Sequence, residues 1–447
     1  MVRLAKSAYK VGWLAALSIE LAAAVAMLDS RHDTPWNYHQ DPQSRNQYIF
    51  GSINGHNVVI TFLPDGVYGT TSATRVAQDF QRDFPDLVYR FTVGIAGGAP
   101  SAKNDVKLGD VVVSRPLAGS PGIIQYDLGK ALEDGVFVPT GCLPRPPDNI
   151  LRALPLVRQW PEEMLNAVVF QVLADVFQRD ARFRPPPSDD NLFASNYHHQ
   201  GRESDPCVLS CDPSHHVSRA PRASWLDIKK EHGVTLDYLR WGHVDNDICT
   251  DTQPPRIHFG TIASGNTLMR DGEARTKIQT QTGALCFEME AAGIMDAWPC
   301  LVVRGICDYS DSHKNKVWQS YAAGTAAAFT KFLLMSISHK NERIPPPSYL
   351  GSIRPVRPDP NRTFSQEDQE EETSSSHTDP RLPTTEIINR NGSRVRIIGE
   401  INTNGGALFN GGQRFAAQNI ELNSGGSGGS TFNGDQEFNS SGNLRIG

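Results

Sequence analysis

Three acidic residues that are far apart in the sequence could act together on one bond. Glu20, Glu290 and Asp308 each stand at the carboxyl end of a candidate β-strand. Carboxyl groups can protonate a leaving group, hold sugar hydroxyls and activate water, which are the tasks in cleaving a glycosidic bond. Because ligand crevices of open α/β sheets form at the carboxyl ends of strands, we expect these side chains to share one crevice.

The elements that must position these acids alternate between strand-like and helix-like runs. The expected strands are Val11–Leu17, Asn57–Leu63, Tyr89–Ile95, Asp110–Ser114, Arg256–Ala263 and Cys300–Ile306. The expected helices are one from Ser18, with Ser18 as its N-cap, and Thr70–Phe84, Leu165–Asp180, Glu288–Ala297 and Lys316 to about Lys340. Short apolar strands that alternate with helices predict an α/β domain, with a three-layer αβα arrangement around a largely parallel, mixed central sheet.

Length and composition divide the chain into three parts. Its 447 residues exceed the size of one ordinary core. We expect an α/β domain at 8–340 with a polar insertion at about 182–255. A disordered linker rich in Pro, Ser and Glu is expected at 341–385, followed by a tail rich in Gly and Asn at 386–447.

Charge and cysteine content indicate the setting. The formal net charge of −6 argues against a general binder of polyanions, so no nucleic-acid partner is expected. Seven cysteines without regular spacing fit a reduced interior, and we expect a cytoplasmic protein. Val11–Leu28 is mostly apolar and resembles a signal peptide or short membrane span. Glu20 in its centre makes a span expensive, so we interpret the segment as a buried strand that leads into a helix and expect no membrane span.

One cysteine and histidine cluster hints at zinc. Cys207 and Cys211 are followed by His215 and His216. Zinc sites use these ligand types, but the spacing is loose, and ordinary loops also carry these residues. We therefore assign no metal site from the sequence, and zinc binding by Cys207, Cys211 and His215 stays an open alternative.

The tail contains an internal repeat. Residues 405–415 and 428–438 align with an offset of 23 residues and seven of eleven positions identical. Arg414 then lies opposite Glu437, and with one inserted residue Glu421 lies opposite Arg445. Stacked β-rungs would pair opposite charges, Phe with Phe and Asn with Asn. The motif residues are Phe409, Asn410, Gly411, Arg414, Phe415, Phe432, Asn433, Gly434, Glu437 and Phe438. The alternative is a flexible Gly/Asn/Ser segment without a role.

Four motifs of the α/β domain occur in the order found in one family. They are 93–98 (VGIAGG) with 106–111 (VKLGDV), 260–266 (GTIASGN), 287–292 (FEMEAA) and 302–308 (VVRGICD). In these residues the chain resembles the purine/uridine phosphorylase and nucleosidase family, over roughly residues 8–338 apart from the insertion. It is most similar to fungal members, which carry comparable runs at 304–309 and 311–316.

The resemblance implies a nucleoside phosphorylase-like fold and a role for each matching residue. Met289 would pack on base or sugar, and Glu290 would bind the ribose 2′- and 3′-hydroxyls. Asp308 would donate a proton to purine N7, and Glu20 would position the attacking water. The remaining residues expected to bind substrate are Gly94, Ile95, Gly97, Gly98 and Asn266.

The same comparison bears on the reaction and the substrate. Phosphorylases carry an arginine for phosphate near the first strand, and none occurs between Val11 and Asp29, which favours hydrolysis. No cofactor is expected, apart from phosphate if the reaction is phosphorolytic. Some immune effectors with this domain resemble nucleosidases that act on ATP, and Arg270, Arg275 and Lys277 are candidate contacts for phosphates. Ile95 and Cys307 replace common serines, which leaves open a sensor that binds a nucleoside without cleaving it.

The tail resembles the two-rung β-solenoid motifs of fungal signalling proteins. Such motifs occur on effector domains and at the N-termini of nucleotide-binding receptors. The resemblance implies prion-like, amyloid-type self-assembly and a receptor of the NLR type that carries a matching motif. It places the protein in fungal immunity, as in programmed cell death and heterokaryon incompatibility. A lone two-rung unit leaves both strand edges open, so a partner is expected.

Overall fold

The computed structural model describes residues 2–337 apart from 118, 132, 134–136, 188–189, 203–204 and 233–251, together with the backbone of eight strands between residues 384 and 446. The chain divides into two compact units, Met1–Gly351 and Ser352–Gly447.

The first unit is built on a mixed sheet of ten strands, in the order β11-β10-β6-β12-β5-β1-β4-β3-β2, with β7 beside β10. The strands are β1 (Val11–Ala15), β2 (Ser30–His32), β3 (Ile49–Ile53), β4 (His56–Phe62), β5 (Tyr89–Gly98), β6 (Val111–Ser114), β7 (Ile123–Gln125), β10 (Ile257–Ser264), β11 (Ala284–Glu288) and β12 (Leu301–Asp308). β1, β4, β5 and β12 run parallel to one another, whereas β12 and β6 are antiparallel. A small hairpin of β8 (Gly129–Ala131) and β9 (Phe137–Pro139) stands apart from this sheet.

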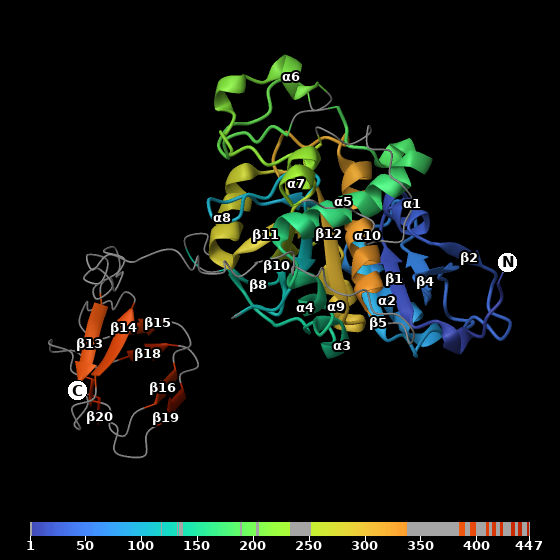
Figure 1. Cartoon of the computed structure of the whole chain (residues 1–447), viewed down its shortest axis with the longest axis horizontal. Coiled ribbons are helices and arrows are strands. Elements are labelled where there is room, and N and C mark those ends of the chain that lie inside the picture. The colour runs from blue at the N-terminus through green and yellow to red at the C-terminus, as the bar shows by residue number, and fades with distance from the viewer. Residues whose placement is uncertain are drawn as a thin grey trace, which may run out of the picture. The chain divides into compact units, whose positions relative to one another are not determined.

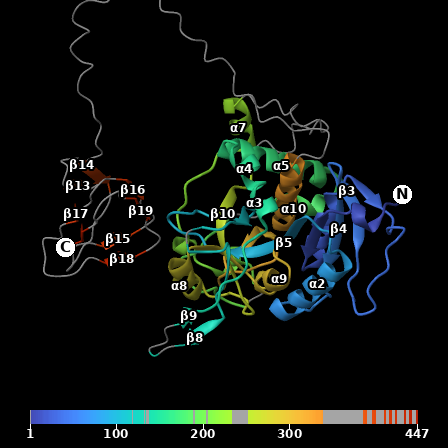
Figure 2. The same cartoon turned by 90° about the horizontal axis from the view of Figure 1, so that it is seen from below.

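Helices cover both faces of the sheet because alternate strand residues point to opposite sides. The helices of the domain outside the insertion include α1 (Ser18–Ala26), α2 (Thr70–Asp83), α5 (Glu162–Arg179), α8 (Gly272–Thr282), α9 (Ala291–Ala297) and α10 (Gln319–Ser336). Trp13 and Val303 belong to a core formed with α1, α5 and α10, whereas Leu14 and Val302 belong to a second core formed with α2 and α9. Figure 2 shows α5 and α10 on one side of the sheet and α2 and α9 on the other. The predicted three-layer arrangement with helices on both faces is therefore present.

One half of the sheet closes on itself. β11 pairs with β10 in parallel and also with β5 in the antiparallel sense, through Cys286↔Gly98 and Phe287↔Gly97. The strands β5, β12, β6, β10 and β11 thus form a ring, which the sequence did not predict (Figure 1). The closure brings the end of β11 beside the end of β5.

Several predicted boundaries need correction. Ser18 is the first residue of α1 and Leu17 is its N-cap, and the Glu20 carboxylate in the first turn accepts from the N–H groups of Leu17 and Ala16. The helix expected from Glu288 begins at Ala291, since Ala284–Glu288 forms β11. The segment from Val11 is a buried strand followed by a helix, as expected. Within the described residues, none of the helices has both the length and the apolarity that a bilayer crossing requires.

The predicted insertion contributes short elements to the domain. Its described part contains α6 (Cys207–Ser210), α7 (Trp225–His232) and 3₁₀ turns at Ala181–Phe183 and Pro213–His215. Phe193 and Trp225 are buried, so the insertion is anchored by aromatic side chains.

In the second unit, strands pair in the register given by the sequence repeat. β15 (Leu408–Asn410) pairs in parallel with β18 (Thr431–Asn433), β16 (Arg414–Ala416) with β19 (Glu437–Asn439), and β17 (Glu421–Leu422) with β20 (Arg445–Ile446). The backbone partners include Phe409↔Phe432, Asn410↔Asn433 and Arg414↔Glu437. A hairpin of β13 (Thr384–Ile388) and β14 (Arg394–Ile398) precedes them. Gly411, Gly434 and residues 341–383 of the expected linker lie outside the described residues.

Candidate active site

Glu20 lies just past the end of β1, in the first turn of α1, and is buried. Its Oε2 accepts hydrogen bonds from the N–H groups of Ala16 (2.7 Å) and Leu17 (2.9 Å), and its Oε1 accepts one from Ile95 (2.8 Å). Burial raises the pKa of Glu20 above its ordinary value, although Arg304 and these N–H groups oppose the shift. The side chain thus caps a helix and at the same time joins β1 to β5.

A buried arginine holds the acids together. Arg304 on β12 is fully buried and donates to the Glu288 carboxylate at the end of β11. Burial alone would lower its pKa, but Glu288, Glu20 and Glu290 outweigh burial and raise it. Gly94 of β5 passes so close that a methyl group there would overlap both the Arg304 guanidinium and Glu20. Gly94 is therefore required for this charge cluster to form.

Glu290 follows β11 and joins the same cluster. Its Oε1 accepts a hydrogen bond of 3.3 Å from the N–H of Gly69, just before α2. Burial, followed by repulsion from Glu288, raises the pKa of Glu290 to about 7. A carboxyl group with this pKa can change its protonation state near neutrality, which is a property common at functional sites.

Asp308 ends β12 and is paired with a lysine. Its Oδ2 lies 2.7 Å from Lys314 Nζ and accepts from the Cys307 thiol at 3.1 Å, while its Oδ1 accepts from the Ser310 N–H at 2.9 Å. Gly97 faces this carboxylate, since a methyl group on Gly97 would lie 2.6 Å from Asp308 Oδ1. Burial would lower the pKa of Lys314, but Asp308 outweighs it and the pKa is raised. The Asp308–Lys314 pair thus holds a transferable proton that a leaving group bound beside Asp308 could receive.

The other predicted residues surround these groups. Ile95 contributes its N–H to Glu20, and Gly98 sits in the β5–β11 pairing. Met289 is partly exposed between the two glutamates 288 and 290. Asn266, after β10, accepts hydrogen bonds of 3.0 Å from both the N–H and the hydroxyl of Thr70. Asn266 therefore orders the start of α2 beside Gly69.

β5 links the three predicted acids to one another. The N–H of Ile95 on β5 donates to Glu20, and Gly97 on β5 is the strand partner of Asp308. Because β11 runs antiparallel to β5, the chain that follows β11 carries Glu290 back toward Gly94. Glu20 also raises the pKa of Glu290 through its charge, so the two carboxylates are close. The acids thus lie around one end of β1, β5 and β12.

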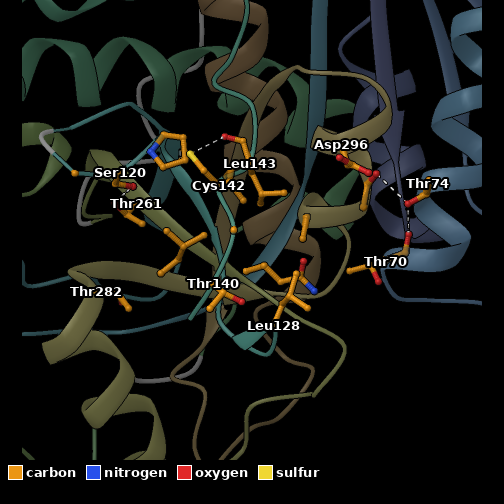
Figure 3. Close-up of a pocket in the computed structure, with 18 of the residues that line it drawn as sticks. Thr70, Thr74, Ser120, Leu128, Thr140, Cys142, Leu143, Thr261, Thr282 and Asp296 are labelled. Atoms are coloured by element: carbon orange, nitrogen blue, oxygen red, sulfur yellow. Dashed lines mark hydrogen bonds between the residues drawn. The ribbon is translucent and has the colours of Figure 1, made fainter. Parts of the chain in front are cut away.

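A separate hollow flanks this region. This cavity has a volume of about 1140 Å³, and hydroxyl side chains of Thr70, Thr74, Ser120, Thr261 and Thr282 are among those that line it (Figure 3). None of the three predicted acids lines it. Its walls offer hydroxyl hydrogen bonds but few titratable groups, so the size of this cavity does not locate the acid–base chemistry.

The three cations suggested for phosphate groups differ in their surroundings. Arg275 is buried, donates to the carbonyl of Tyr309 (2.7 Å) and faces Asp311 at 3.6 Å, which makes it a structural residue. Lys277 is exposed on α8. Arg270 lies close enough to Lys314 to oppose its protonation. Arg270 is thus the cation of the three that borders Asp308.

Sequence reasoning overlooked several members of the cluster. Arg304, Glu288 and Lys314 lie inside or beside the recognised motifs, but were not assigned to the site. Arg304 carried a signal, because a charge within an otherwise apolar strand requires a buried partner. Gly69 gave none, since its N–H reaches Glu290 across 221 residues of chain.

With this geometry described, known proteins provide a comparison. No family model matches the chain. It is 38% identical over 337 residues to a "Nucleotide-binding leucine-rich repeat (NLR)-like protein" of Hyaloscypha variabilis, covering 75% of this chain and 30% of that protein. It is also 41% identical over 80 residues to "ATP nucleosidase Cap17" of Escherichia coli, covering 17% of this chain and 16% of that protein. The chain therefore spans well under half the length of these relatives.

Solved structures show weaker likeness. Futalosine hydrolase of Helicobacter pylori has 15% identity and a TM-score of 0.40, with 74% of this chain and 99% of that chain covered. The 5'-methylthioadenosine/S-adenosylhomocysteine nucleosidase of Neisseria meningitidis has 13% identity and a TM-score of 0.42, with 73% and 99% covered.

Replacing Glu290 with glutamine tests the burial of this acid. Its pKa of about 7 in the folded state exceeds the ordinary 4.5, so the folded chain binds the proton more tightly than the unfolded chain. The stability contributed by that proton is present below pH 4.5 and is lost as pH rises toward 7, by roughly 3 kcal/mol. We expect Glu290→Gln to gain stability relative to wild type between pH 5 and pH 8, measured by urea unfolding.

The control for this measurement is Glu273→Gln, a change to an exposed glutamate of α8. It should track the wild type at both pH values. An equal difference between Glu290→Gln and wild type at pH 5 and pH 8 would mean that Glu290 is not held in a low-dielectric site.

Proposed function

We propose that the first unit hydrolyses the N-glycosidic bond of a purine nucleoside or nucleotide. The observation that carries the proposal is the arrangement of Glu20, Glu290 and Asp308 around one end of β1, β5 and β12, with Arg304 between the two glutamates. Such a reaction needs a group for the sugar, a group for water and a proton donor. The cluster supplies one carboxyl group for each.

Glu20 is the group for water. A carboxylate offers about four acceptor positions, and three of those on Glu20 are taken by backbone N–H groups. The remaining position can accept a hydrogen bond from one water molecule. Its raised pKa makes Glu20 a stronger base than an exposed glutamate, so it can remove the proton as water attacks the anomeric carbon.

Glu290 and Asp308 act on the two sides of the bond. Ionised Glu290 accepts hydrogen bonds from the vicinal hydroxyls of the ribose. As the bond breaks, a proton of the Lys314 ammonium group passes through the Asp308 carboxylate, 2.7 Å away, to the departing base, which leaves Lys314 neutral. Glu20 releases to solvent the proton that it took from the attacking water, and Lys314 takes one up from solvent, so the site returns to its starting protonation state.

Hydrolysis fits the charge of the site better than phosphorolysis. The charge of Arg304 beside the sugar-side acids is already matched by Glu288, Glu20 and Glu290. A phosphate ion would meet net negative charge there. Water carries no charge and avoids this repulsion.

ATP is the nucleotide that we propose first. The relative named ATP nucleosidase matches 80 residues of this chain at 41% identity. Arg270 lies beside the Asp308–Lys314 pair and could contact a phosphate chain.

Release of free base tests this proposal. Purified full-length chain is incubated with ATP, AMP, adenosine or inosine, and the products are separated by chromatography. We expect adenine or hypoxanthine from at least one of them. Asp308→Asn and Glu20→Gln should each lower turnover by about 10²- to 10⁴-fold, the usual contribution of a positioned acid or base.

Asp86→Asn, a change to an exposed acid between α2 and β5, is the matched control and should keep wild-type turnover. Absence of free base from all four compounds, with assembled and unassembled protein, would contradict hydrolysis. If calorimetry then still detected nucleoside binding, the domain would be a sensor, which is the alternative that Cys307 beside Asp308 leaves open.

We further propose that the tail controls the activity by assembly. The tail register places Arg414 opposite Glu437 and Glu421 opposite Arg445, so both rungs carry complementary charges. The proposed partner is a receptor of the NLR type that carries a matching motif, and the NLR-like name of one relative supports the receptor part of this proposal. Stacking on such a template would concentrate the enzyme domains in a fungal immune or cell-death response.

Charge reversal tests the tail register. Arg414→Glu should slow fibril formation by full-length protein, measured with an amyloid dye and electron microscopy, because like charges would face each other between rungs. Adding Glu437→Arg should restore part of the rate, since the pair is again complementary. Fibrils of equal rate in all three proteins, or none in the wild type, would contradict the proposed stacking.

A further inference from the structure

Three metal-ligand side chains meet in the insertion, away from the acids of the candidate active site. One ligand atom each of His199, Cys207 and Cys211 lies within 4.8 Å of the other two. His199 Nδ1 is 3.4 Å from Cys207 Sγ and 3.3 Å from Cys211 Sγ. In a tetrahedral zinc site with bonds of about 2.3 Å to sulfur and about 2.0 Å to nitrogen, these atoms would be roughly 3.5 Å apart. The two observed N–S separations lie within about 0.2 Å of that value and are therefore compatible with a shared zinc ion.

The protonation of His199 fits the same conclusion. Its Nε2 is 3.0 Å from the carbonyl oxygen of Arg202, which can only accept a hydrogen bond. The proton of a neutral imidazole therefore sits on Nε2, and the Nδ1 lone pair points at both sulfurs. One lone pair cannot accept good hydrogen bonds from two thiols, but it can bind a metal that both thiolates share. A backbone carbonyl behind a histidine ligand is the usual support in zinc sites.

Local structure positions the two cysteines. Cys207 opens the single helical turn of α6 and Cys211 is its C-cap. Residues four apart on a helical turn lie on one side, so both thiols face His199. The N–H of His199 donates to the Ser312 hydroxyl at 2.8 Å, which fixes the third ligand against the loop after β12.

A fourth possible metal ligand, the buried His313, lies beside this trio. Among the described residues neither ring nitrogen of His313 has a hydrogen-bond partner, and Nδ1 only faces Asp311 Oδ1 at 3.6 Å, although the residue is 9% exposed. Its ring stacks on Phe193 with centroids 4.0 Å apart and lies 5.8 Å from the ring of His199. Buried polar groups without partners are rare in folded proteins. His313 is thus an available fourth donor next to the trio.

The sequence spacing had pointed to different histidines. His215 stacks on Tyr197 at 4.0 Å, and His216 packs edge-on against Phe193 at 4.4 Å. Both therefore support the aromatic cluster around the trio. His199 was overlooked because it precedes the cysteines in the chain, whereas the histidines considered from spacing follow them.

We propose that His199, Cys207 and Cys211 form a structural zinc site. Two thiolates and an imidazole favour zinc over the hard cations Mg²⁺ and Ca²⁺. The bound ion would tie α6 to the loop that carries Ser312, His313 and Lys314. Because Lys314 pairs with Asp308, the ion would stabilise the position of the proton donor from outside the active site.

Metal analysis of the untagged full-length protein tests the proposal. After gel filtration we expect roughly one zinc per chain by mass spectrometry of the metal content. Titration of metal-free protein with Co²⁺ should give the near-ultraviolet band of thiolate-to-cobalt charge transfer. Wild type that holds no zinc, and whose metal-free form gives no such band, would overturn the proposal without any variant.

Two variants and two controls locate the ligands. Cys207→Ser and Cys211→Ser should each lose the bound zinc and the charge-transfer band. Cys142→Ser changes an exposed free cysteine outside the trio, and His215→Gln changes the histidine favoured by spacing; both should retain zinc. Retention of zinc in both ligand variants, or its loss in Cys142→Ser, would overturn the assignment. None of these readouts depends on nucleoside cleavage, so they can fail or succeed independently of the proposed function.

Discussion

The guanidinium of Arg304 is the interaction on which the candidate site depends. An arginine buried in a strand is costly unless acids surround it, and Glu288, Glu20 and Glu290 provide that environment. The same arginine lets acids from the ends of β1 and β11 remain close despite their mutual repulsion. Gly94 is the backbone counterpart, because only a residue without a side chain leaves room for both charges. Stability and chemistry thus share one buried cluster.

The positions of the strands could be predicted more completely than the residues of the candidate site. Apolar runs identified β1, β4, β5, β6, β10 and β12 to within a few residues, since buried parallel strands have nearly continuous apolar sequences. The acids were recognised by their place after such runs and by family motifs. The β5–β11 pairing was not predicted, because Ala284–Phe287 was assigned to no element and the register of β11 depends on ring closure. Gly69 joins the site only through tertiary folding, because 221 residues of chain separate it from Glu290.

The insertion shows how a loop-rich segment can acquire order without a core of its own. Its ring stacks and the trio around His199 replace the apolar area that strands and helices would bury. The sequence spacing there pointed to the wrong histidines, because the proposed third ligand, His199, precedes the two cysteines rather than following them. In the tail, by contrast, the repeat in the sequence and the pairing of β15 with β18 carry the same register. Repetition is a signal that needs no tertiary information.

A structure of the chain with a non-cleavable purine ribonucleoside analogue tests the central claim most directly. The account predicts the ribose hydroxyls at Glu290, a ring nitrogen of the base at Asp308, and a water molecule between Glu20 and the anomeric carbon. An analogue bound instead in the threonine-lined cavity of Figure 3, with the three acids away from the sugar–base bond, would contradict it.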